Sequence, residues 1–206
     1  MKASLIKLFP ENIEQRKVQK IVDVLKDGGI IIYPTDTVYG LGCDIFQPKA
    51  VEHIAQIKRA KTNTFSFICY DLSHISDFAK QVDTPTFKLM KKALPGPYTF
   101  ILNATNRVPK ILHTKKKTVG IRVPDNPIPR EIVRQLGNPI ITTSIHDEDE
   151  VIEYSTDPEL IYEKYQNQVD LVIDGGYGNN VASTVINCTQ AEPEVVREGL
   201  GDLSIL

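Results

Sequence analysis

Hydrophobic residues recur along the chain with the period of a helix in some segments and as short continuous runs in others. Segment 12–25 has apolar residues at the spacing of one helical face, and Gly28 and Gly29 follow where such a helix ends. The next run, 30–33, is apolar throughout, as expected for a strand buried on both faces, and Pro34 ends it because proline cannot extend a hydrogen-bonded ladder. This stretch predicts a helix, a turn and a buried strand.

The rest of the chain alternates in the same way. Helices are predicted to begin at Pro48, to surround Phe87 and to cover 128–136 and 158–165. Strands are predicted over 65–69, 98–102, 118–123, 139–143, 169–173, 184–187 and 194–197. Helix–strand alternation is typical of a layered α/β fold, and neighbouring strands without a helix between them imply antiparallel pairs. Because no repeat or linker interrupts the pattern, we expect one α/β domain over residues 1–206, with helices flanking a mixed parallel and antiparallel sheet.

Composition excludes several classes of protein. The 206 residues carry 24 lysines and arginines against 26 aspartates and glutamates, and 41% are hydrophobic, which is ordinary for a folded domain. The apolar runs are far shorter than the roughly 20 residues that cross a bilayer. The N-terminal segment lacks the apolar core of a secretory signal, so we expect a cytoplasmic protein. The three cysteines and four histidines show no ligand spacing, and we predict no disulfide framework and no bound metal.

Charge is unevenly distributed along the chain. Segment 86–134 holds eleven lysines and arginines, including the run Lys115, Lys116 and Lys117, whereas 141–174 holds ten acidic residues against one lysine. A cationic segment attracts phosphates or nucleic acid through a field that weakens with salt. Solvated lysines on helix and loop surfaces explain each single residue equally well.

Polar segments that follow the predicted strands carry the most specific signal. They read YPTDTVYGLG at 33–42, PGPYT at 95–99, GIRVP at 120–124, TTS at 142–144, ASTVI at 182–186 and VREG at 196–199. Standard phosphate-loop and nucleophile motifs are absent from the sequence. In order and spacing these six segments resemble the YrdC/YciO-like family, which includes the threonylcarbamoyl-AMP synthases. The resemblance extends over residues 14–206.

The resemblance implies a reaction and a fold. Synthases of this family combine L-threonine, bicarbonate and ATP into threonylcarbamoyl-adenylate and pyrophosphate, which feeds a modification of the adenosine beside tRNA anticodons. ATP is therefore expected as a substrate with Mg²⁺ held mainly by its phosphates, L-threonine and bicarbonate are expected partners, and RNA or tRNA is a further one. The implied fold is a twisted mixed sheet with a concave cationic face. Such chemistry depends on positioning and charge stabilisation rather than on a covalent nucleophile.

The resemblance also assigns roles to eight residues. Lys58 and Arg122 match catalytic positions, and the planar fork of Arg122 suits the threonine carboxylate. Threonine-binding positions are matched by Thr35, Thr142 and Ser183. Nucleotide-binding positions are matched by Lys58, Thr118, Ser144 and Arg197.

The same residue types have plain structural explanations. Without the resemblance, Thr35 fits a turn cap, Ser183 fits a strand end, and Arg122 fits a surface pair with Asp125.

Two synthase signatures are incomplete, as in the YciO-type branch of the family. The Lys-x-Arg signature reads Lys58-Arg59-Ala60, the Ser-x-Asn signature reads Ser144-Ile145-His146, and Cys69 replaces a common histidine. The primary hypothesis is a nucleotide-binding protein with threonylcarbamoyl-AMP synthase activity. The alternative is a protein that binds double-stranded RNA or tRNA through Lys115, Lys116 and Lys117 without efficient synthase activity. A third hypothesis is carbamoyl or adenylyl transfer to an acceptor other than threonine.

Overall fold

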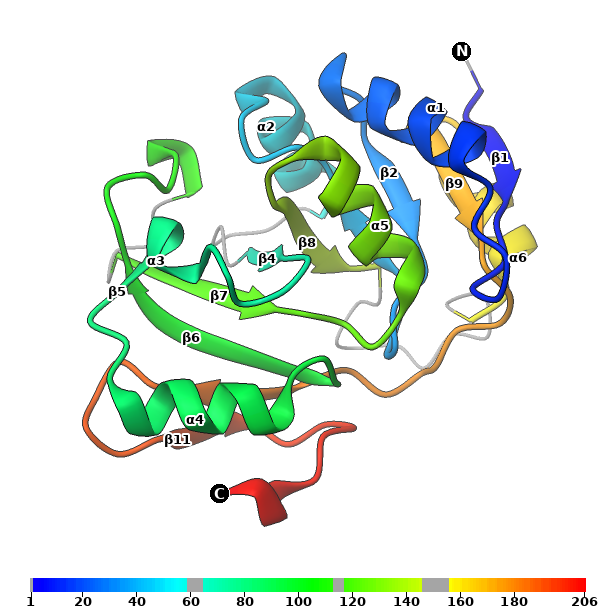
Figure 1. Ribbon diagram of the computed structural model, residues 1–206. Helices are drawn as coiled ribbons and strands as arrows, with labels where there is room; N and C mark the ends of the chain where they lie inside the picture. Colours follow the sequence, from blue (N-terminus) through cyan, green and yellow to red (C-terminus); the bar gives the residue numbers. More distant parts are fainter. Residues whose placement is uncertain (1, 59–64, 113–116, 146–155) are drawn as a thin grey trace.

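The computed structural model describes residues 2–58, 65–112, 117–145 and 156–206, which form helices around a strongly twisted sheet (Figure 1). The strands are β1 (Ser4–Lys7), β2 (Ile31–Tyr33), β3 (Gly40–Gly42), β4 (Ser66–Ile68), β5 (Ala79–Lys80), β6 (Tyr98–Ala104), β7 (Thr118–Arg122), β8 (Ile140–Ser144), β9 (Leu171–Asp174), β10 (Thr184–Asn187) and β11 (Glu194–Arg197). The helices are α1 (Gln15–Lys26), α2 (Pro48–Ile57), α3 (Ile75–Phe78), α4 (Thr84–Ala93), α5 (Pro127–Leu136) and α6 (Pro158–Tyr165).

The sheet is mixed, as the helix–strand pattern predicts. In the described residues its order is β1–β9–β2–β3–β8–β4–β7–β6–β10–β11, with β5 paired to β6. β9 is parallel to β1 and β2, β4 is parallel to β7, and β6 is parallel to β10. The other pairs are antiparallel, so helix-linked and hairpin-type connections coexist.

Alternating side chains of the strands feed two hydrophobic clusters, one on each face of the sheet. In β2, Ile31 and Tyr33 pack with α1 and α5, whereas Ile32 joins the cluster on the opposite face. α1 contributes four buried residues at helical spacing, Val18, Ile21, Val22 and Leu25. α1 and α5 lie next to each other over one face (Figure 1). The continuous apolar run at 30–33 is thus explained by burial on both faces.

The ends of α5 follow from its sequence. Asn126 accepts a hydrogen bond from the Ile128 N–H at 3.0 Å, proline occupies the first turn, and Gly137 ends the helix with φ of +86° in the left-handed region. None of the helices in the described part of the chain combines the length and apolarity needed to cross a bilayer.

Four short elements are not predicted from the sequence: β1, β3, α3 and β5. β3 lies inside the polar segment 33–42, where two glycines flank Leu41 and hide the strand pattern. A Cβ on Gly42 would lie 2.2 Å from the carbonyl oxygen of Ile141, so β3 and β8 approach each other only because glycine stands there. α3 has four residues, too few to display a helical period.

Candidate functional site

A cavity of about 520 Å³ lies over one face of the central strands. Since residues two apart in a strand share a face, β7 presents Thr118, Gly120 and Arg122 to it, and β8 presents Thr142 and Ser144. β3, the start of β4, β6 and the segments that hold β10 and β11 complete the wall. The lining is therefore rich in hydroxyl groups and includes two arginines.

Six of the eight residues expected from the sequence surround this cavity. They are Thr118, Arg122, Thr142, Ser144, Ser183 and Arg197. Four separate motifs supply five of them, Thr118 lies two residues before one of these motifs, and the strand pairing brings all of them together. Their binding roles stay predictions, but their placement around one space is a finding.

The other expected residues lie elsewhere. Thr35 is buried in the loop after β2, and Lys58 is the half-buried residue that ends α2; neither belongs to the cavity wall. Lys117 is exposed and outside the wall as well. Lys115 and Lys116 lie outside the described residues, as do the signature positions 60 and 146.

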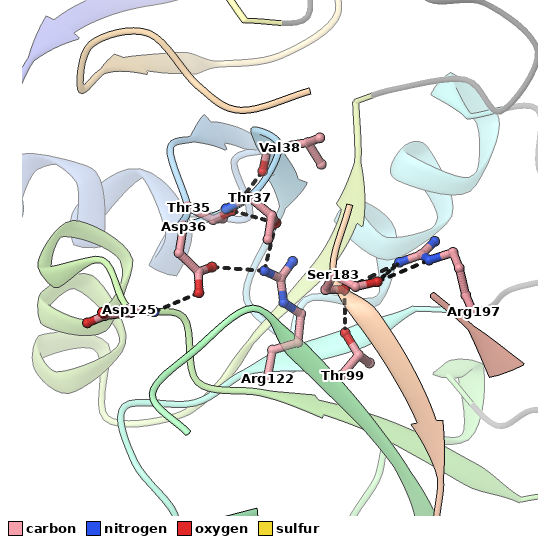
Figure 2. Close-up of polar contacts among 9 residues, drawn as sticks. All are labelled: Thr35, Asp36, Thr37, Val38, Thr99, Arg122, Asp125, Ser183 and Arg197. Atoms are coloured by element: carbon pink, nitrogen blue, oxygen red, sulfur yellow. Dashed lines mark hydrogen bonds and ion pairs between the residues drawn. The ribbon is translucent and has the colours of Figure 1, made fainter. Parts of the chain in front are cut away.

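Arg122 is the most constrained polar group of the wall. Its side chain is 8% exposed, and its Nη2 donates to Asp36 Oδ1 at 3.1 Å and to Thr37 Oγ1 at 2.9 Å (Figure 2). Its Nε is buried with no hydrogen-bond partner among the described residues. Burial lowers the pKa of Arg122, while the neighbouring charge of Asp36 acts in the opposite direction.

The surface pair of Arg122 with Asp125, considered from the sequence, is wrong. Arg122 is buried, and its carboxylate partner is Asp36 in the loop after β2. Asp125 takes part only through its backbone, because its N–H donates to Asp36 Oδ2 at 3.0 Å. One carboxylate therefore joins the loop after β2 to the end of β7.

Thr35 has the turn-capping geometry that its position suggests. Its hydroxyl donates to the Val38 carbonyl oxygen at 2.8 Å, accepts from the Thr37 N–H at 3.0 Å and lies 3.1 Å from Thr37 Oγ1. A hydroxyl has one proton to donate and two lone pairs, so these contacts engage all of them. In this structure Thr35 holds the loop that carries Asp36 and Thr37, and its direct contact with a ligand stays a prediction.

A second polar group lies across the cavity from Arg122. Ser183 Oγ is 2.8 Å from Thr99 Oγ1, and Arg197 donates from Nε and Nη2 to the Ser183 carbonyl oxygen at 3.1 and 2.9 Å (Figure 2). Ser183 and Thr99 are buried, whereas Arg197 is exposed. Arg197 is therefore oriented by a backbone carbonyl while its residue remains accessible to solvent.

The wall includes two glycines at points where strands and side chains crowd together. A Cβ on Gly40 would lie 2.9 Å from Tyr33 Cζ and 3.0 Å from Thr142 Oγ1, and a Cβ on Gly120 would lie 2.5 Å from Ser66 Oγ. Burial raises the pKa of the Tyr33 phenol beneath Gly40, so this group stays protonated. The cavity floor is therefore formed partly by bare backbone.

Three residues of the site were not expected from the sequence: Asp36, Thr37 and Thr99. Each lies inside a motif that was recognised, but the motif alone does not reveal which side chain meets Arg122 or Ser183. Cys69, which replaces a histidine common in the synthases, does not line this cavity but a second one of about 670 Å³ beyond the opposite end of β4. Burial raises the pKa of its thiol to about 12, so the thiol stays protonated at neutral pH.

The described residues bring no three His, Cys, Asp or Glu side chains together at a metal-binding spacing. A hard cation such as Mg²⁺ binds through oxygen ligands and often through the phosphates of a nucleotide.

Comparison with known proteins extends these observations. The family model for Sua5, YciO and YrdC proteins, described as "Telomere recombination", matches residues 23–199. The "Uncharacterized protein YciO" of Escherichia coli is 42% identical over 198 residues, which cover 95% of each chain. A crystal structure of E. coli YciO matches with a TM-score of 0.93 over 98% of each chain at 40% identity.

More distant relatives carry functional names. The threonylcarbamoyl-AMP synthase of Pyrococcus abyssi is 28% identical over 191 residues, covering 92% of this chain and 56% of the synthase. A crystal structure of P. abyssi Sua5 complexed with L-threonine matches with a TM-score of 0.86 at 26% identity, covering 95% of this chain and 57% of that one. These similarities support the mixed α/β sheet and the motif assignment made from the sequence.

Proposed function

This chain belongs to the Sua5/YciO/YrdC family, and from that membership we propose that its cavity binds ATP and L-threonine and forms threonylcarbamoyl-adenylate from them and bicarbonate. The relative that is complexed with L-threonine supports the amino acid as a ligand. The relatives named as synthases support the reaction class.

The observation that carries the proposal is the pair of arginines on one hydroxyl-rich cavity. Arg122 is buried beside the loop after β2, and Arg197 lies by the accessible edge formed by β10 and β11. A guanidinium forms paired hydrogen bonds with a carboxylate or with a phosphate. The two cations thus match a ligand pair with one carboxylate and one triphosphate.

The proposed reaction needs positioning more than an activated side chain. The threonine amine and bicarbonate give a carbamate and water, and a carbamate oxygen then attacks the α-phosphorus while the bond to the leaving pyrophosphate breaks. Arg122 holds the threonine carboxylate, and the hydroxyls of Thr142 and Ser183 orient the amino acid. Arg197 stabilises negative charge on the phosphates. Mg²⁺ bound to ATP supplies further charge neutralisation.

Pyrophosphate release tests this proposal. Release from ATP and Mg²⁺ is measured with and without L-threonine and bicarbonate, for the native protein and for Arg122→Ala. Dependence on both co-substrates and loss in Arg122→Ala are the expected results. Because the Lys-x-Arg signature lacks its arginine here, Ala60→Arg is a gain-of-function comparison. If neither the native protein nor Ala60→Arg releases pyrophosphate, the synthase proposal is contradicted.

Binding of double-stranded RNA or tRNA is the second candidate. The observation that favours it is that four lysines of the cationic segment 86–134 are exposed, namely Lys88, Lys91 and Lys92 on α4 and Lys117 before β7. Binding of nucleic acid through lysines is indifferent to sequence, and its affinity falls steeply as salt rises. Loss of binding in a variant with Lys115, Lys116 and Lys117 all replaced by Glu is expected, and a flat salt response would contradict it.

A further inference from the structure

Arg122 offers only part of its guanidinium to the cavity. A guanidinium has five N–H donors, two on each terminal nitrogen and one on Nε. Nη2 makes two hydrogen bonds, one to Asp36 and one to Thr37, so its protons are engaged. Nη1 and Nε make none to the described residues, and Nε is fully buried.

The engaged corner is itself tightly held. Asp36 is 9% exposed at its side chain, and its second oxygen accepts the Asp125 N–H at 3.0 Å, so the carboxylate is fixed at both ends. Thr37 is fully buried, and its hydroxyl lies 3.1 Å from that of Thr35. Asp36 and Thr37 lie on one side of the guanidinium and Ser183 lies on the other (Figure 2).

We propose that Asp36 is a positioning residue, which acts with Thr37 to fix Arg122 so that Nη1 is directed to the carboxylate of an amino-acid ligand. This inference rests on the proposed function, because it names threonine as that ligand. Arginine is a long side chain with many rotamers, and holding one corner removes the entropy that a ligand would otherwise have to overcome. Asp36 also compensates the charge of a guanidinium that is largely buried.

Threonine binding by isothermal titration calorimetry tests the functional part. Asp36→Asn keeps the size of the side chain and removes its charge, and Asp36→Ala removes both acceptors. We expect the dissociation constant for L-threonine to rise about tenfold or more in either variant, the scale on which outer partners of ligand-binding groups act. Asp125→Ala is the matched control, since it keeps the backbone N–H that Asp36 accepts, and native affinity is expected. If native protein binds threonine and Asp36→Asn binds it equally well, the positioning role is overturned while the proposed function stands.

Nitrogen-15 NMR of the Arg122 side chain gives a readout that does not depend on threonine. With Nη2 held, rotation about the Nε–Cζ bond is slow, and separate Nη1 and Nη2 signals are expected in the native protein. In Asp36→Asn these signals should broaden or merge while far-UV circular dichroism stays native. Arg122→Lys identifies the signals by their loss. Averaged Nη signals in the native protein would overturn the inference, whatever threonine does. Separate signals without threonine binding in native protein would instead contradict the proposed function.

Discussion

Gly120 lies at the floor of the cavity, where β4, β6 and β7 run side by side, and its replacement by alanine probes how closely they approach. It is paired with Ser66 of β4 and with Ile101 of β6. A Cβ at this position would lie 2.5 Å from Ser66 Oγ, 3.1 Å from Ser66 Cβ and 3.3 Å from Thr99 Cγ2. Rotation of the Ser66 side chain relieves the contact with Oγ, but the contact with Ser66 Cβ is relieved only if the β4 backbone moves.

The expected cost follows from overpacking, which typically lowers stability by about 1–3 kcal/mol. We expect Gly120→Ala to lower the free energy of unfolding by about 2 kcal/mol, because one contact is relieved by rotation and one is not. For a chain of this length that corresponds to a fall in Tm of roughly 4–8 °C. Urea unfolding followed by far-UV circular dichroism measures it, since the chain has no tryptophan.

A double-mutant cycle identifies the opposing atoms. Ser66→Gly removes both Ser66 contacts and on its own costs about 0.5–1 kcal/mol, as glycine does within a strand. In the Gly120→Ala background the same change should restore about 1 kcal/mol, which gives a clear coupling energy. Losses that simply add in the double variant, or a Gly120→Ala variant as stable as native, would refute the reasoning that Ser66 limits the space above Gly120.

Three further variants test other contacts. Ser183→Ala removes the hydroxyl that meets Thr99 Oγ1 at 2.8 Å, and we expect a loss of about 1–2 kcal/mol in unfolding free energy and weaker L-threonine binding by calorimetry. The hydrogen bond from Arg134 lowers the pKa of Glu131; this stabilisation is complete above the unfolded-state pKa of about 4.3 and is lost as pH falls through the lower folded-state pKa. Glu131→Gln should therefore lower the urea midpoint at pH 7, with the difference vanishing in acid. Gly137→Ala should cost about 1 kcal/mol, measured by urea unfolding, because φ is +86° and no neighbour lies within 4 Å.

Each of these expectations has a contrary result. Native L-threonine affinity and stability in Ser183→Ala would show that the Thr99 contact contributes nothing. A Glu131→Gln deficit that is the same at pH 3 and pH 7 would contradict the assigned pKa shift. A Gly137→Asn variant should lose less than the alanine variant, since asparagine tolerates the left-handed region better, and the reverse order would contradict a backbone origin.

Strand periodicity explains why much of the site could be predicted from the sequence. The segment GIRVP belongs to a predicted strand, and the two-residue period alone places Thr118, Gly120 and Arg122 on one face. The same rule places Thr142 with Ser144 in β8. What periodicity cannot supply is the order of strands in the sheet. That order, set by contacts between distant segments, is what brings β10 and β11 with Ser183 and Arg197 to the same cavity as β7.

Residue types and their spacing do not reveal which side chains form ion pairs or hydrogen bonds across the fold. Arg122 has Asp125 three residues away, yet it pairs with Asp36, which is 86 residues earlier in the chain. A short extended segment after β7 turns the Asp125 side chain to solvent, whereas the loop after β2 brings Asp36 and Thr37 to the guanidinium of Arg122. The turn cap at Thr35 could be anticipated from its residue type, because its contacts are local. Contacts between distant segments depend on the fold as a whole.

The two arginines of the cavity therefore differ in how much each contributes to folding. Arg122 is buried against Asp36 and Thr37, and removing one member of such a buried pair leaves the other without its partner, which typically costs about 3–5 kcal/mol. Folding alone is thus sufficient reason to keep Arg122. Arg197 and Lys58 are exposed or half-buried, and their replacement costs folding far less. A family member could lose the reaction through changes at such accessible positions, while the buried pair still holds the cavity in shape.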